Sequence, residues 1–361
     1  DDRGLLVPSE FPDVRSKLQE WSSLDFTDLS LEIMQLFTIG LWELNLDGSR
    51  KLDQEGNFIP TYDNQTITEM AKVFTGMSHS TTNNGRAATS FHNVARGNDY
   101  LYNMKVWDEE HEPGPKSIIN GVELDGNQTG EEEVQAALDA LVAHPSVPPF
   151  LSRLLIQRFT SSNPSAAYLA RVSRVWVDDS TGESADLGEV IKAILLDPEV
   201  LSGGDRHQFH GKVREPIIRY ASLARAFNLV SESGKYWTNQ PLLNDDFGQF
   251  PMLSPSVFNF YLPDFSPEGE FREAGMFSPE LQLASLSQML RSDSRFAASV
   301  EESGVSGRFD FTRELALVSE PSALVSRVDL LMTGGRLKAE TKLAILNAVQ
   351  SELTDLEKVR T

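Results

Sequence analysis

A series of amphipathic helical segments between residues 129 and 198, joined by short connections, is the sequence feature that most constrains the fold. The series begins at Thr129 and Glu132, which fit a capping box because each side chain can bond a free backbone N–H of the other residue. Apolar residues then recur at spacings of three and four, which places them on one helix face: Val134, Ala137, Leu138 and Leu141. Similar spacing predicts helices over residues 151–159, 165–175 and 186–195. Short loops between such helices predict antiparallel neighbours in a bundle.

The rest of the chain adds further helices and little β-structure. Apolar spacing predicts helices over residues 28–40, 66–76, 217–227, 278–291, 321–332 and 338–353. Alternation predicts short strands over 42–46, which leads into the turn signal Asp47-Gly48, and over 100–106. The expected fold class is therefore mainly α, a multi-helix bundle with one or two small β-hairpin elements. We expect residues 28–361 to form a single α-rich domain, and residues 1–27 to be an arm or the remnant of a longer chain.

Composition excludes several classes of function. With 361 residues, 40% of them hydrophobic, the chain can bury a full-sized core, yet no stretch approaches the roughly 20 apolar residues of a membrane-spanning helix. The net charge of −21 makes nucleic acid an unfavourable partner, because phosphate backbones would be repelled. The sequence contains no Cys, which excludes disulfides, thiolate metal sites and cysteine nucleophiles.

Several short runs, taken in order, resemble the family catalogued as domain of unknown function 1800. These runs are QLFTIG at 35–40, AKVFTG at 71–76, HEPGPK at 111–116, residues 144–164, residues 193–198, KVREP at 212–216, PSVFNFY at 255–261 and the C-terminal helical hairpin. The resemblance covers about nine tenths of the chain, without the helical region that such proteins have upstream. It implies a secreted or otherwise extracytoplasmic location, often with a sulfatase-like protein encoded nearby, and it implies no established activity.

The first candidate site is centred on His111. Asp108, Glu109, Glu110 and Glu112 surround this histidine in sequence. An imidazole near carboxylates can bind a divalent metal or act as a general base, so His111 and Glu110 are candidate metal ligands and a divalent metal is the candidate cofactor. Lys116 and, more distantly, Glu32 complete the candidate catalytic set. The alternative interpretation is a solvated acidic turn with a structural histidine.

The second candidate is a group of charged residues on neighbouring predicted helices. Its members form either internal ion pairs that orient helices or a pocket for an anionic substrate: Arg153, Arg158, Lys212, Arg214 and Glu215. His207 and His210 have the spacing of metal ligands but lie among glycines, and His144 is interpreted as a capping or hydrogen-bonding group. The triplets that begin at Asn64 and Asn127 are candidate glycosylation sites.

The motifs that would identify a common enzyme are absent. The sequence has no Gly-rich phosphate loop, no Gly-x-Ser-x-Gly elbow and no His-Glu-x-x-His helix. The leading hypothesis is therefore an extracytoplasmic binding or structural module that acts with a protein or polysaccharide partner. The alternative is a metal-dependent hydrolase of a sulfated or otherwise anionic glycan that uses His111.

Overall fold

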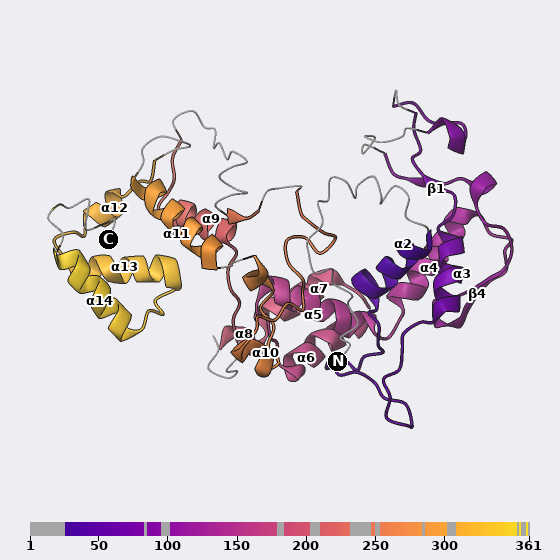
Figure 1. The fold of residues 1–361 in the computed structure, drawn as a ribbon, viewed down its shortest axis with the longest axis horizontal. Coiled ribbons are helices and arrows are strands. Elements are labelled where there is room, and N and C mark those ends of the chain that lie inside the picture. Colours follow the sequence, from indigo (N-terminus) through magenta and orange to yellow (C-terminus); the bar gives the residue numbers. More distant parts are fainter. Residues whose placement is uncertain are drawn as a thin grey trace. The chain divides into compact units, whose positions relative to one another are not determined.

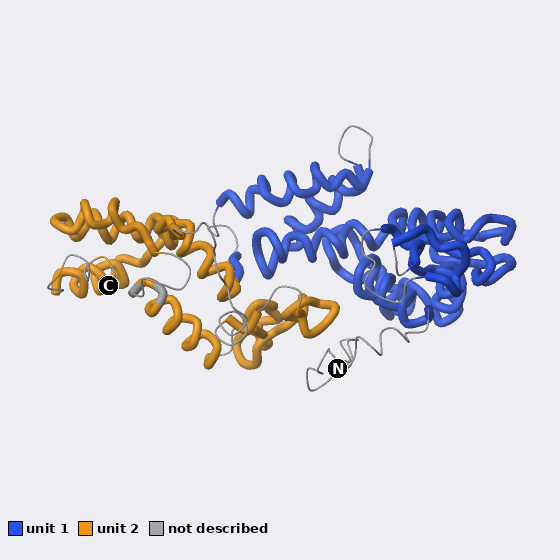
Figure 2. The backbone as a smooth tube through the Cα atoms, turned by 90° about the horizontal axis from the view of Figure 1, so that it is seen from above, with its two compact units in different colours: residues 1–212 blue, residues 213–361 orange. Residues whose placement is uncertain are grey.

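The protein divides into two compact units, residues 1–212 and residues 213–361, here called unit 1 and unit 2 (Figure 2). The computed structural model describes residues 26–82, 85–94, 102–178, 184–202, 210–231, 247–249, 253–283, 286–301, 308–351, 354 and 359. The predicted arm therefore lies outside the described residues except for its last two positions. Both units contribute to the range 28–361, and the single-domain organisation of that range stays a prediction.

Unit 1 is mainly helical, as predicted (Figure 1). Its helices are α2 (Phe26–Glu32), which continues as a π-helix (Ile33–Thr38), α3 (Asn64–Val73), α4 (Gly130–Val142), α5 (Val147–Phe159), α6 (Ala166–Val177), α7 (Leu187–Leu196) and α8 (Pro198–Leu201). Short 3-10 turns lie at Phe91–Asn93, Asp108–Glu110 and Ile119–Gly121. The predicted capping box is confirmed, since Thr129 accepts the backbone N–H of Glu132 and Glu132 accepts that of Thr129.

Two small antiparallel sheets accompany the helices of unit 1. In the first, β1 (Met77–Ser78) pairs with β2 (Lys105–Val106), and Met77 lies opposite Val106. In the second, β3 (Lys116–Ile118) and β4 (Val122–Leu124) form a hairpin in which Lys116 lies opposite Leu124. The expected fold class, mainly α with small β elements, is confirmed in the described part of the chain.

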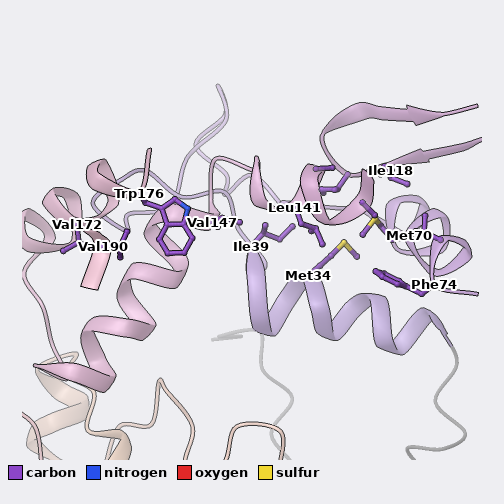
Figure 3. Close-up of a cluster of buried hydrophobic side chains, with 14 of the residues drawn as sticks. Met34, Ile39, Met70, Phe74, Ile118, Leu141, Val147, Val172, Trp176 and Val190 are labelled. Carbon is purple, nitrogen blue, oxygen red and sulfur yellow. The ribbon is translucent and has the colours of Figure 1, made fainter. Parts of the chain in front are cut away.

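A single hydrophobic core joins the helices of unit 1. Met34, Met70, Leu141, Ile156 and Val190 are each at most 1% exposed and belong to it. Figure 3 shows side chains from α3, α4 and the π-helix at one end of this core and from α6 and α7 at the other. Helices α5 and α6, α6 and α7, and α2 and α3 contact each other most extensively, so neighbours in sequence are also neighbours in space.

The segment between the π-helix and α3 forms a compact double hairpin. Isolated antiparallel bridges join Trp42 to Pro60, Leu44 to Arg50 and Leu52 to Phe58. The predicted turn at Asp47-Gly48 is present, with the backbone N–H of Asn45 bonded to the carbonyl oxygen of Ser49 at 2.8 Å. Gly48 has a positive φ of 81°, and a Cβ placed on it would lie 2.5 Å from a methyl carbon of Leu169. Glycine at this turn therefore lets the hairpin pack closely against α6.

Unit 2 is also helical, with a smaller core. Its elements are α9 (Pro216–Ala226), α10 (Glu270–Glu273), a 3-10 turn (Pro279–Gln282), α11 (Leu286–Glu301), α12 (Thr312–Leu315), α13 (Pro321–Thr333) and α14 (Ala339–Ser351). Helices α13 and α14 form the predicted C-terminal hairpin, whose buried core consists of Leu324, Val325 and Val349. Around α9, the ring of Phe296 stacks on Tyr220 with centroids 6.0 Å apart. No helix in the described residues is long and apolar enough to cross a membrane.

Two predicted helices differ from the structure in their details. The helix predicted over 28–40 changes to π geometry at Ile33, and the hydroxyl of Thr38 bonds back to the carbonyl oxygen of Ile33, five residues earlier, at 2.7 Å. Gly40, with a φ of 73°, follows its end, as expected for a helix that stops at glycine. The helix predicted to start at Ser278-Pro279 begins as a 3-10 turn, and α11 is described from Leu286 to Glu301.

Candidate functional site

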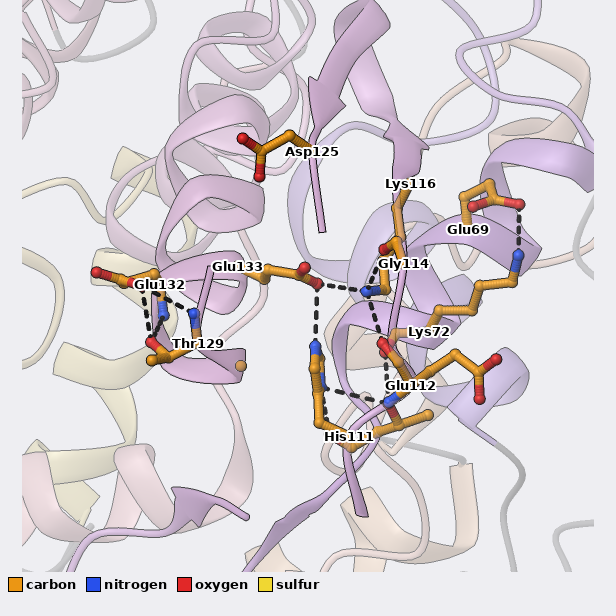
Figure 4. Close-up of polar contacts among 12 residues, drawn as sticks. Glu69, Lys72, His111, Glu112, Gly114, Lys116, Asp125, Thr129, Glu132 and Glu133 are labelled. Atoms are coloured by element: carbon orange, nitrogen blue, oxygen red, sulfur yellow. Dashed lines mark hydrogen bonds and ion pairs between the residues drawn. The ribbon is translucent and has the colours of Figure 1, made fainter. Parts of the chain in front are cut away.

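His111 and Lys116 lie together in unit 1, and a third residue, Glu133, connects them (Figure 4). Oε2 of Glu133 is 2.7 Å from Nζ of Lys116 and 3.0 Å from Nε2 of His111. The side chains of Lys116 and Glu133 are each 1% exposed, and that of His111 is 7% exposed. We call His111, Lys116 and Glu133 the buried charge cluster.

The turn before β3 supplies the remaining partners of Lys116. Its ammonium group donates to the carbonyl oxygens of Glu112 at 2.7 Å and Gly114 at 3.2 Å, as well as to Glu133. Gly114 has a φ of 93°, which lets the chain turn so that both carbonyl groups face the ammonium. An ammonium group has three N–H donors, and all three of Lys116 are therefore used within the protein.

His111 also has a partner at each ring nitrogen. Nδ1 lies 3.0 Å from the carbonyl oxygen of Thr75, and Nε2 faces Glu133. The hydroxyl of Thr75 accepts the backbone N–H of Glu112 at 2.7 Å and donates to the carbonyl oxygen of Lys72 at 2.6 Å, so it holds this segment beside α3. Little free space remains between the imidazole ring of His111 and α4, because a Cβ atom added to Gly130 would lie 3.1 Å from the ring.

Glu133 is the central member of the cluster, and it is not among the site residues predicted from the sequence. It lies in the first turn of α4, among three consecutive glutamates that read as an acidic helix start. One signal was available: Glu133 precedes Ala137 by four residues and Leu141 by eight, so it belongs to the apolar face of the predicted helix. A charged residue on such a face needs a buried partner.

The acidic residues beside His111 in sequence bind elsewhere. Glu110 lies 3.3 Å from His92, and Asp108 accepts the first backbone N–H of α4, at Gly130, at 2.9 Å. Glu109 accepts the backbone N–H of Phe91 at 3.3 Å. In the described residues no group of three or more His, Cys, Asp or Glu side chains is arranged to hold a metal. A divalent metal bound by His111 and Glu110 stays a prediction that the contacts of these two residues do not favour.

Glu32, the third proposed catalytic residue, lies at the end of α2. Its side chain forms no hydrogen bond or ion pair with any described residue, so the structure does not link it to the buried charge cluster. Burial, and then the neighbouring carboxylate of Asp28, raises the pKa of Glu32. The structure thus brings together two of the three proposed catalytic residues, His111 and Lys116, and their catalytic role stays a prediction.

The predicted group of basic residues is divided between the two units. In unit 1, Lys212 donates to the carbonyl oxygens of Gln157 at 3.0 Å and Arg158 at 3.1 Å, near the C-terminal end of α5. This contact places a cation where the helix dipole is negative. In unit 2, Arg214 is exposed, while the carboxylate of Glu215 accepts hydrogen bonds from Tyr261 and Gln249. Arg153 and Arg158 each have an interaction as well, and both interpretations of the group, helix-orienting ion pairs or an anion pocket, stay predictions.

The other predicted residues have ordinary structural surroundings. Nδ1 of His144 accepts the backbone N–H of Ser146 at 3.1 Å, as expected for a hydrogen-bonding histidine, and burial lowers its pKa. His207 lies outside the described residues, so its pairing with His210 stays a prediction. Asn64 and Asn127 are both exposed, the first in the opening turn of α3 and the second just before α4.

One family model matches nearly the whole chain. The family described as protein of unknown function (DUF1800) matches residues 29–360. A model described as threonine synthase N terminus matches residues 1–46, most of which lie outside the described residues. No curated protein and no solved structure matches the chain significantly.

Proposed function

Because the chain belongs to the family described as protein of unknown function (DUF1800), we propose its function from its own residues: an extracytoplasmic binding or structural module that acts with a protein or polysaccharide partner. The extracytoplasmic location is supported by the runs that resemble this family. The exposed positions of Asn64 and Asn127 are compatible with it.

The observation that carries this proposal is the closed hydrogen bonding of the buried charge cluster. The ammonium group of Lys116 uses its three donors on Glu112, Gly114 and Glu133, and both ring nitrogens of His111 face protein oxygens. A general base or nucleophile must reach a substrate atom through at most one water molecule. Side chains that are 1–7% exposed and bonded to each other are better suited to holding a scaffold together.

An affinity purification from the native source tests the partner. The tagged chain is isolated under gentle conditions, crosslinked, and analysed by mass spectrometry and by sugar analysis of the same eluate. We expect a stoichiometric protein or polysaccharide that the tag alone does not capture. Recovery of the chain by itself, as a monomer, would contradict the proposal.

Elemental analysis separates this proposal from a metal-dependent hydrolase. Protein purified without chelator should contain well under one equivalent of any divalent metal, and its stability should not change when EDTA is added. The matched control is Glu110→Gln, which removes a proposed ligand that lies outside the buried charge cluster. One equivalent of metal in the wild type, lost in this variant, would favour the hydrolase instead.

A further inference from the structure

The double hairpin between the π-helix and α3 brings three side chains together at its surface. Trp42, Arg50 and Phe58 follow one another at intervals of eight residues. Backbone hydrogen bonds join the three arms of the hairpin at equivalent positions. The N–H of Glu43 donates to the carbonyl oxygen of Ile59 at 2.8 Å, that of Lys51 to Glu43 at 2.8 Å, and that of Ile59 to Lys51 at 3.3 Å. The equal spacing therefore places one residue from each arm in the same group.

The guanidinium of Arg50 lies over both aromatic rings. Its central carbon is 4.8 Å from the ring centre of Phe58 and 5.8 Å from that of Trp42, and the two ring centres are 5.6 Å apart. These distances fall within the range of cation–π contacts. Contact with two rings at once restricts the positions that the guanidinium group can take.

Arg50 forms no hydrogen bond or ion pair with any residue that the structure describes, although the chain has 53 acidic and 32 basic residues. The nearby carboxylates bind within their own turns. Asp47 accepts the backbone N–H of Ser49 at 2.9 Å, and Asp53 accepts that of Asn57 at 2.7 Å. Lys51, the other cation of the hairpin, is paired with Glu43 at 3.1 Å. Arg50 is thus a pre-oriented cation without an acidic partner in the described part of the chain.

We propose that Trp42, Arg50 and Phe58 form a docking surface for an acidic polysaccharide, one that carries carboxylate or sulfate groups on its sugar rings. A guanidinium edge matches such groups bidentately. Beside it, Phe58 is 45% exposed and Leu52 is 56% exposed, so an apolar surface is available for the C–H face of a sugar. The acidic groups of such a ligand would pair with Arg50, and its sugar rings would cover the apolar side chains.

Charge complementarity selects this ligand over a neutral one. A neutral glycan would cover the rings but leave the guanidinium edge with weaker, uncharged partners. The overall charge of −21 opposes any anion at long range, but salt at physiological strength screens such repulsion beyond about 8 Å, whereas a direct bidentate contact persists. The inference rests on the proposed function, because it takes the polysaccharide as the partner and assigns the surface that binds it.

The test is a calorimetric titration of the full chain with three oligosaccharide probes. Oligogalacturonate carries carboxylates, its methyl ester is the neutral form of the same backbone, and a sulfated galactan oligosaccharide carries sulfates. We expect the wild type to bind at least one acidic probe, and to bind oligogalacturonate about tenfold more tightly than its ester if the carboxylate is the recognised group. Preference for the sulfated probe alone would identify sulfate as that group.

Substitutions then locate the surface. Arg50→Gln should weaken binding of the acidic probe about tenfold, and Arg50→Lys should restore only part of it, because an ammonium lacks the planar fork. Arg336→Gln is the matched control: it removes the same charge from an exposed arginine of unit 2 and should leave binding unchanged. Unfolding curves confirm that each variant is folded.

Three results would overturn the inference. Equal losses in Arg50→Gln and Arg336→Gln would show that only net charge matters. Binding by the wild type that Arg50→Gln does not weaken would place a polysaccharide site elsewhere and leave the proposed function standing. A wild type that binds none of the probes, but captures a protein in the affinity purification, would remove the polysaccharide and keep the binding module.

Discussion

The core of unit 1 and the core of the α13–α14 hairpin in unit 2 hold buried charges in different ways. Unit 1 has an extensive core with contributions from α2 to α7, and its lysine–glutamate pair is 1% exposed at both side chains. The hairpin has three buried apolar residues, and its own buried carboxylate, Asp329, pairs with a lysine that is 38% exposed. One cluster is enclosed by a core, and the other lies at the edge of one.

The difference concerns what each cluster stabilises. In unit 1 the apolar core holds the helices together. The charged groups inside it must be paired, because an unpaired buried charge carries a large desolvation penalty. In the hairpin, Asp329 fastens the end of α13: it accepts from Leu337 at 3.1 Å, from Thr333 and from Lys342 at 3.0 Å, around the glycine turn. The small core of the hairpin therefore depends on these polar contacts for its closure.

The largest expected effect comes from breaking the pair in unit 1. Lys116→Met should lower the free energy of unfolding by about 3–5 kcal/mol, because the buried carboxylate of Glu133 loses its lysine and keeps only His111 as a partner. Urea unfolding followed by tryptophan fluorescence measures the loss. The double variant Lys116→Met/Glu133→Leu is the control and should recover most of the stability. A loss below about 1 kcal/mol in the single variant would mean that water reaches the cluster.

The next largest effect tests the small core of the hairpin. Leu324 is 2% exposed, and Leu324→Ala should cost about 2–5 kcal/mol through lost burial and the cavity that remains. Hydrogen exchange of the α13 and α14 amides reports the loss in unit 2 specifically. Leu330→Ser, at a side chain that is 64% exposed on the same helix, should change stability by less than about 0.5 kcal/mol. Equal effects of the two substitutions would contradict the assigned core.

A smaller loss of stability is expected from a substitution where α4 approaches the buried charge cluster. A Cβ on Gly130 would lie 2.4 Å from a methyl carbon of Val106, so Gly130→Ala should cost about 1–3 kcal/mol through overpacking. Adding Val106→Ala provides space and should return part of this stability in a double-mutant cycle measured by urea unfolding. If the two substitutions are simply additive, the assumed contact does not limit the packing.

The smallest expected effect is the loss of stability of the α13–α14 hairpin at low pH. The hydrogen bond from Thr333, helped by Leu337 and Lys342, lowers the pKa of Asp329 below its usual 3.8. A lowered pKa in the folded state contributes stability that is present above the unfolded value and is lost as the pH falls through the folded one. Methyl NMR of Leu324 and Val349 during urea titrations at stepwise lower pH should show this loss. The Asp329→Asn variant should be less stable at neutral pH, and its stability should depend less on pH in the acid range. If the pH dependence of stability is unchanged in this variant, other carboxylates cause it.

The helices of the molecule were largely predictable because their information is local. Apolar spacing and the pair Thr129 and Glu132 identify α4 without reference to the rest of the chain, and Gly40 marks the end of the first helix. The π geometry from Ile33 was missed because it changes the hydrogen-bond spacing by one residue and leaves composition unchanged. The 3-10 turn at Pro279–Gln282 was missed because a 3-10 turn and an α-helix begin with the same proline signal.

The candidate site was predictable only in part because its contacts are not local. His111 stood out by its acidic neighbours, yet those neighbours bind His92, Phe91 and Gly130, and the residue that pairs with it is Glu133. Nothing short of the tertiary arrangement brings the first turn of α4 beside β3. A charged residue on an apolar helix face was the available local sign.

Thr75, which holds one side of the histidine ring, lies 36 residues before His111, and Glu133 lies 22 residues after it. The cluster therefore acts as a noncovalent crosslink that closes two successive loops, one on each side of the histidine. Loop-closure entropy rises slowly with loop length, so one crosslink can restrict both loops at a moderate entropic cost. The two loops stay restrained for as long as His111 keeps its contacts with Thr75 and Glu133.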